Sequence, residues 1–195
     1  MLRAFDYIVT FTGERVYPTH PSINTIHIED IAHALAHKCR FNGHTKQFYS
    51  IAQHSVIVNN LFPYNNLWGL LHDASEAYLP DVASTIKHLF PTLKYAEKIC
   101  EDKIRERFNL PTLSTEQHDV LKKIDLAVLK LEWDALIDNP NNYDLLPHLG
   151  KDVIPVVHWK INGFWPPVEA ERVFLKVFNN GQNAIWNKSS CRICL

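Results

Sequence analysis

Apolar residues recur at helical spacing along most of this 195-residue chain, and this periodicity is what most limits the folds open to it. The pattern begins near Ile28 and continues to a last predicted helix over Val168 to Phe178. Only the first 22 residues favour strands, because β-branched and aromatic residues flank a Thr12-Gly13 turn there. The sequence therefore predicts an all-α fold with a small N-terminal β-hairpin.

Proline, glycine and capping residues divide the helical part of the sequence into segments. Ser50 and Gln53 have the Ser-x-x-Gln spacing of a capping box, which starts a helix at this point. We expect a single domain with a β appendage (1–22), a helical core (28–137), and an irregular segment followed by the last helix (138–195). Helices are expected over residues 28–39, 50–62, 67–78, 93–108, 112–137 and 168–178, with a short helical stretch in the loop 81–90.

Composition excludes several classes of protein. The net charge of -1 argues against an electrostatic nucleic-acid binder. The sequence has neither the apolar run of a signal peptide nor that of a membrane span, so we expect a cytoplasmic protein without membrane contact. Its cysteines are expected to be free thiols, and the pair Cys191 and Cys194 lacks the second pair that a structural zinc site normally needs.

A histidine interrupts the apolar face of the second predicted helix. His54 stands on the stripe formed by Ile51, Val58 and Leu61. A buried imidazole needs either a hydrogen-bond partner or a metal ion, and the sequence alone leaves both open. The pair His33 and His37, spaced four residues apart, presents the same choice between a second metal site and a plain polar helix face.

The next predicted helix contains His72, Asp73 and Glu76, whose spacing places three polar side chains on neighbouring parts of one helical surface. A capped ion pair or a simple polar face is the alternative interpretation. Asp125 lies inside a later, strongly apolar helix, where it is either a ligand or a solvent-side partner of Lys122 or Lys130. Two imidazoles and two carboxylates from three helices suit a borderline divalent ion such as Mn, Co, Fe, Ni or Zn: His54, His72, Asp73 and Asp125.

This order of residues resembles the HD-domain metal-dependent phosphohydrolases, whose pattern is His, then His-Asp, then Asp. The chain is most similar to the small bacterial and phage 5′-deoxynucleotidase-like branch of that family. The similarity covers roughly residues 28 to 135 and rests on two motifs followed by an aspartate: Gln53-His54-Ser55, the run Leu71-His72-Asp73-Ala74-Ser75-Glu76-Ala77-Tyr78, and Asp81.

The resemblance implies an HD-domain helical bundle that holds one divalent ion (Mn, Co, Zn or Mg) at the four residues named above. It implies that Glu76 acts as general base or acid on the attacking water, and that Asp81 lies near that water or the sugar. Substrate-binding roles are implied for Arg40 and Phe41, on phosphate and base, and for Lys87, on phosphate. His44, in the loop on the substrate side, is a further candidate for phosphate contact.

The expected function is therefore hydrolysis of phosphate from 2′-deoxynucleotides by metal-activated water. The substrate is either a deoxynucleoside monophosphate or a triphosphate such as dATP, and the resemblance further implies a homo-oligomer. A non-catalytic helical module that senses a metal or a nucleotide is the alternative, although such a module would have no need of Glu76.

Overall fold

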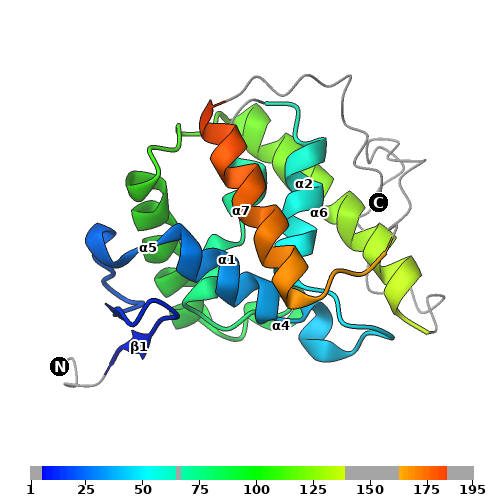
Figure 1. The fold of residues 1–195 in the computed structure, drawn as a ribbon, viewed down its shortest axis with the longest axis horizontal. Coiled ribbons are helices and arrows are strands. Elements are labelled where there is room, and N and C mark those ends of the chain that lie inside the picture. The colour runs from blue at the N-terminus through cyan, green and yellow to red at the C-terminus, as the bar shows by residue number, and fades with distance from the viewer. Residues whose placement is uncertain (1–5, 65–66, 139–162, 184–195) are drawn as a thin grey trace.

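The computed structural model describes residues 6–64, 67–138 and 163–183, and these form a mostly helical fold with one two-stranded sheet (Figure 1). This confirms the all-α prediction with its N-terminal hairpin. The elements in chain order are β1 (Ile8–Val9), β2 (Arg15–Val16), the 3₁₀ helix η1 (Ile23–Thr25), α1 (Ile28–His37), η2 (Arg40–Gly43), α2 (Ile51–Leu61), α3 (Trp68–Leu71), η3 (Ala74–Ala77), α4 (Ser84–Lys87), α5 (Pro91–Arg107), α6 (Thr115–Leu136) and α7 (Pro167–Asn183).

The hairpin is fastened to the first helix by one aspartate. β1 and β2 pair antiparallel, and Gly13 supplies the positive φ of +88° that the turn requires. The backbone N–H and the hydroxyl of Thr12 donate to the two carboxylate oxygens of Asp30, at 2.7 and 2.9 Å. Because Asp30 is buried at the start of α1, the tip of the hairpin is held against this helix.

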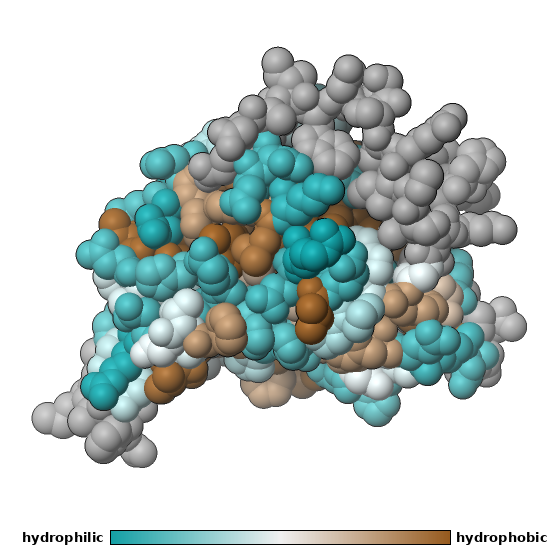
Figure 2. Space-filling view, viewed as in Figure 1, coloured by the Kyte–Doolittle hydropathy of each residue, from teal (hydrophilic) through white to brown (hydrophobic). Residues whose placement is uncertain are grey.

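The core is arranged around α2. α7 crosses the molecule over α1 and α2, and α6 packs on another side of α2 (Figure 1). All eight residues from Ile51 to Val58 are buried, so even the polar side chains of this helix lie inside the protein. The face shown in Figure 2 is covered mainly by hydrophilic residues with hydrophobic patches between them. Within the described parts of the chain, every helix is too short or too polar to cross a membrane.

The predicted helix over 67–78 is wrong as a continuous element. α3 ends at Leu71, the backbone of Asp73 departs from helical angles (φ −101°, ψ 13°), and η3 follows. His72 Nδ1 donates to the carbonyl of Gly69 at 2.8 Å, a carbonyl that would accept from the Asp73 N–H in a continuous α-helix. The segment therefore still winds, but its side chains do not follow one α-helical face.

The last helix is longer than predicted. α7 continues past Phe178 through Asn179, Asn180 and Gly181, although asparagine and glycine often end helices. Gly181 serves packing instead, because a Cβ at this position would overlap the side chain of Leu67. Residues 139–162 of the predicted irregular segment, and the tail with Cys191 and Cys194, lie outside the described residues.

Candidate metal centre

Two histidines face each other at the centre of the fold. His54 on α2 is fully buried, and its Nε2 lies 3.3 Å from His72 Nε2, which follows α3. The other nitrogen of each ring is already bonded: His54 Nδ1 to Glu132 Oε1 at 2.7 Å, and His72 Nδ1 to the Gly69 carbonyl at 2.8 Å. Both acceptors need a hydrogen on Nδ1, so the two Nε2 lone pairs of neutral rings point at one another.

Two aspartates complete the cluster. Asp73 Oδ2 lies 3.2 Å from His72 Nε2 and 3.7 Å from His54 Nε2. Asp125 Oδ1, from α6, lies 3.1 Å from His54 Nε2 and 3.9 Å from His72 Nε2. The structure thus brings together the four residues predicted as ligands, and it places Asp125 beside the imidazoles rather than on Lys122 or Lys130. His54, His72 and Asp73 form a group that can hold a metal ion.

The donor set fits a divalent transition ion. Facing lone pairs repel unless a cation lies between them, and metal–ligand bonds of about 2.1 Å in a tetrahedron separate the ligand atoms by about 3.4 Å. Without a metal, a proton takes that place. Burial lowers the pKa of His72, but the neighbouring carboxylates, Asp73 above all, raise it to about 9. Two nitrogens and two oxygens are a borderline ligand set that suits Mn, Co or Zn.

Both aspartates are ionised, as metal ligands must be. Burial raises the pKa of Asp73, but His72, His54 and Arg40 together bring it well below its usual range. The pKa of Asp125 is likewise lowered, since the hydrogen bond and charge of His54 outweigh its burial. The two aspartates therefore carry two negative charges, which a divalent cation bound to neutral imidazoles would neutralise.

Sequence reasoning missed Glu132. This carboxylate is fully buried on α6, and it accepts from His54 through Oε1 and from Arg40 Nε and Nη2 through Oε2, at 3.2 and 2.9 Å. Arg40 and His54 lower its pKa against the effect of burial. Glu132 follows Asp125 by seven residues, two helical turns, so both face the same way. That spacing is the signal that could have revealed it.

A cavity of about 310 Å³ opens beside the cluster and carries most of the predicted substrate-side residues. Asp73 and Asp125 form part of its wall, so the metal centre is accessible from it. The lining residues are Arg40, Phe41, Asn42, Asp73, Glu76, Asp81, Val82, Ala83, Thr85, Lys87, Asp125, Leu129 and Trp133.

Glu76 lies on this wall with an unsatisfied oxygen. The residue is 8% exposed, and its Oε2 is buried with no hydrogen-bond partner among the described residues. Burial, and then the charges of Asp73 and Asp81, raise the pKa of Glu76 to about 9. Lys38 Nζ donates to the backbone carbonyls of Glu76 and Leu79, which fixes the short helix η3 in front of the cavity.

The two predicted cations are held by buried acids. Lys87 Nζ lies 2.8 Å from Glu97 Oε1, an ion pair between α4 and α5. The pKa of Lys87 is raised, because Glu97 outweighs its partial burial. Arg40 forms its closest ion pair with Glu132, and its Nη1 lies 3.7 Å from Asp73 Oδ2. Each positive charge therefore has a fixed position on the cavity wall.

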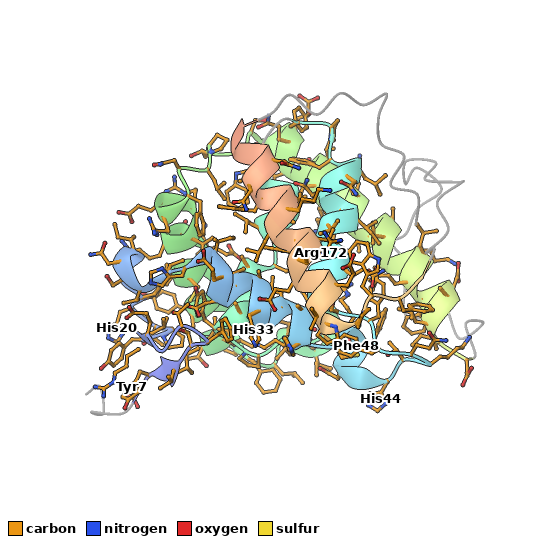
Figure 3. The ribbon with its side chains drawn as sticks, viewed as in Figure 1. Tyr7, His20, His33, His44, Phe48 and Arg172 are labelled. Atoms are coloured by element: carbon orange, nitrogen blue, oxygen red, sulfur yellow. The ribbon has the colours of Figure 1, made fainter. Side chains whose placement is uncertain are left out.

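Aromatic rings form another part of the wall. Phe41 contacts Trp133 edge to face, with ring centroids 6.0 Å apart. The backbones of Phe41 and Asn42 both adopt left-handed angles, with φ of 54° and 51°. Residues other than glycine rarely adopt this conformation. The predicted residue His44 is not brought to the cavity: it is exposed, outside the lining, at an edge of the molecule in Figure 3.

The protein is thus mostly helical and carries a His–Asp cluster beside an open cavity. Its sequence is 38% identical over 181 residues to the uncharacterized protein YfdR of Escherichia coli strain K12, covering 90% of this chain and 95% of YfdR. It is 39% identical over 97 residues to an uncharacterized protein of Rhodobacter capsulatus, covering 45% of this chain and 48% of that protein. No protein-family model matches the sequence. The chain belongs to the same family as YfdR.

Proposed function

We propose that this protein is an HD-domain phosphohydrolase that uses a divalent metal ion to release phosphate from 2′-deoxynucleotides. The observation that carries the proposal is the position of the cluster His54, His72, Asp73 and Asp125 at the wall of a cavity. The same cavity offers a protonatable carboxyl and two fixed positive charges. A purely structural ion cluster would need neither an opening nor these extra groups.

Phosphate hydrolysis needs an electrophile for the phosphoryl oxygen, a proton carrier and charge stabilisation. A divalent ion held by the cluster would act as a Lewis acid and lower the pKa of water. Glu76 is the proton carrier: its pKa near 9 lets it hold a proton at neutral pH and transfer it within the cavity. Asp81, whose pKa burial also raises, lies on the same wall and helps to orient the water or the sugar.

Lys87 and Arg40 would bind the phosphate. Lys87 is about one third exposed and approaches the cavity from the side of α4, whereas Arg40 is held deeper by Glu132. Both can therefore meet an anion without reorganising, which favours charge stabilisation in the transition state. Phe41 and Trp133 offer ring surfaces for the base.

The size of the cavity favours a nucleoside monophosphate over a triphosphate. Its volume of about 310 Å³ lies at the small end of the range for ligand pockets, roughly 300 to 1,000 Å³. A triphosphate such as dATP remains the second substrate to test, because Arg40 and Lys87 would serve either.

The test is phosphate release from a panel of deoxynucleoside mono- and triphosphates with Mn, Co, Zn or Mg, before and after EDTA. We expect metal-dependent release that Asp125→Asn abolishes. The matched control is Asp119→Asn, because Asp119 is an exposed aspartate on the same helix, and this variant should keep full activity. If the metal-loaded protein hydrolyses no nucleotide, the enzyme proposal is wrong. Nucleotide binding without turnover would then favour the sensing module.

A further inference from the structure

A second group of metal-ligand side chains lies on the surface, between α1 and α7. His33 and His37 occupy successive turns of α1, and Glu171 reaches them from α7. His33 Nδ1 lies 3.0 Å from Glu171 Oε2, and one ligand atom from each of the three residues lies within 4.8 Å of the others. Figure 3 shows His33 on α1, on the face of the molecule that α7 crosses. None of these residues belongs to the centre described above.

Hydrogen bonds and ring contacts fix both imidazoles. His37 Nδ1 donates to the backbone carbonyl of His33 at 2.8 Å, which leaves its Nε2 with the lone pair that a metal needs. A metal-binding histidine commonly donates its other ring N–H to a backbone carbonyl, which orients the ring. Phe11 stacks on His33, with ring centroids 3.8 Å apart and an angle of 11° between the planes, and the centroid of the His37 ring lies 4.1 Å from that of His33. The hydrogen bonds of Thr12 to Asp30 hold the residue next to Phe11 against α1.

The carboxylate is not neutralised by the arginine next to it. Arg172 forms two hydrogen bonds with Glu169, at 2.8 and 2.5 Å, so its guanidinium serves that glutamate. Glu171 instead faces the histidines, and the side chains of His33 and Glu171 are 31% and 23% exposed. Two nitrogens and one carboxylate oxygen, accessible to water, are the three-ligand set from which zinc sites are built.

We infer that a zinc ion binds to His33, His37 and Glu171 and joins α7 to α1. The separation of 3.0 Å between His33 Nδ1 and Glu171 Oε2 is close to the 3.3 Å or so between two ligands of one tetrahedral zinc. The ligand atom of the exposed His37 already lies within 4.8 Å of the other two, so a small rotation of its ring about the bond to its backbone would complete the set. Because zinc binds the folded arrangement and not the separated helices, it stabilises the packing of α7. The inference does not depend on the proposed function.

The test is a calorimetric titration of the untagged, EDTA-stripped full chain with Zn²⁺ alone. We compare the wild type with His37→Gln and Glu171→Gln, two surface changes outside the core. The control is His118→Gln, since His118 is an exposed histidine on α6. Each of the first two variants should bind one zinc fewer than the wild type and lose part of the zinc-induced rise in Tm, whereas the control should match the wild type.

The stoichiometry separates this inference from the central site. Two ions in the wild type and one in His37→Gln support both sites. One ion in the wild type and none in His37→Gln supports the surface site alone. Equal stoichiometry in the wild type and His37→Gln, or no zinc in the wild type, overturns the inference, and the contact of His33 with Glu171 is then only a polar link between helices.

Discussion

His54 Nε2 and His72 Nε2 lie 3.3 Å apart, and the Nδ1 of each ring is bonded elsewhere, to Glu132 and to the Gly69 carbonyl. One cation has to separate the two nitrogens. A proton does so in the metal-free protein, and a metal ion would have to displace it. Because a proton and a metal ion would compete for the Nε2 lone pairs of these two histidines, metal binding should depend on pH.

Metal affinity should rise with pH. The pKa of His72 is about 9 in the metal-free chain, whereas a metal ion needs the neutral imidazole. Each ion bound below about pH 9 therefore releases a proton, and we expect the Kd to fall up to tenfold per pH unit. Titration calorimetry in buffers of different ionisation enthalpy measures the released proton. Binding without proton release at neutral pH would contradict the prediction.

The stability of the metal-free chain should change in the opposite direction. The pKa of His72 in the folded chain lies above its ordinary value of 6.5. Its contribution to the free energy of unfolding is therefore complete below pH 6.5 and is lost as the pH rises towards 9. Glu76 acts in the same sense, because its folded pKa of about 9 also exceeds its usual 4.5. We expect the free energy of unfolding, from urea denaturation, to decrease between about pH 6.5 and 9. A stability that rises across this range would show that neither group binds its proton as described.

Glu132→Gln should weaken both the metal site and the fold. Glutamine retains an oxygen for His54 Nδ1, but the buried guanidinium of Arg40 loses its charged partner. We expect metal affinity to fall about 10- to 100-fold, and stability to fall by about 3 kcal/mol, as for a broken buried ion pair. The measurements are Mn²⁺ titration and chemical denaturation. Glu116→Gln, an exposed change on the same helix, should leave metal affinity unchanged.

Glu76→Gln should separate binding from turnover. The side chain lines the cavity and is not among the four clustered ligands, so the variant should bind metal as the wild type does. Loss of the proton carrier should reduce kcat by about 10²- to 10⁴-fold. The same variant should reduce the pH dependence of metal-free stability, since one of the two groups with a raised pKa is gone and His72 remains. Unchanged kcat would remove Glu76 from the mechanism.

Gly69→Ala should displace one half of the cluster. A Cβ at Gly69 would lie 2.6 Å from Asn59 Cα and 3.2 Å from Phe62 Cβ, so α3 has to move away from α2. His72 is bonded to the Gly69 carbonyl and would move with it. We expect a loss of about 1 to 3 kcal/mol from overpacking, together with weaker metal binding. Gly181→Ala meets only the flexible side chain of Leu67 and should cost less.

Periodicity and punctuation were enough to predict the hairpin and most of the helices, because these depend on neighbours in sequence. The four candidate ligands could be picked out for the same reason: His54 and Asp125 interrupt apolar stripes, and His72-Asp73 is a compact motif. That they bind a metal ion stays a prediction. The break between α3 and η3 was not predictable, since it involves Lys38 and its long-range contacts with the carbonyls of Glu76 and Leu79.

Partners distant in sequence account for the other differences. Gln53 was expected to close a capping box, and Ser50 does cap α2, accepting from the Gln53 N–H. The Gln53 amide, however, donates to the Gly163 carbonyl and accepts from the Trp165 N–H, both at 3.0 Å. Likewise, nothing in the spacing of His33 and His37 indicated that Glu171 would lie against them. The sequence periodicity predicts which residues share a helix face, whereas the tertiary packing of the helices determines which of these residues come into contact.

The left-handed backbone angles of Phe41 and Asn42 cost folding free energy, although the side chain of Phe41 lines the cavity. A left-handed residue other than glycine costs on the order of 1 to 3 kcal/mol of folding free energy, and a glycine at the same position would remove most of that cost. Phe41→Gly would relieve this backbone strain, but it would also remove a ring that packs against the core between α2 and α6 and forms part of the cavity wall. A smaller residue at position 41 would therefore change the core packing and the shape of the cavity together.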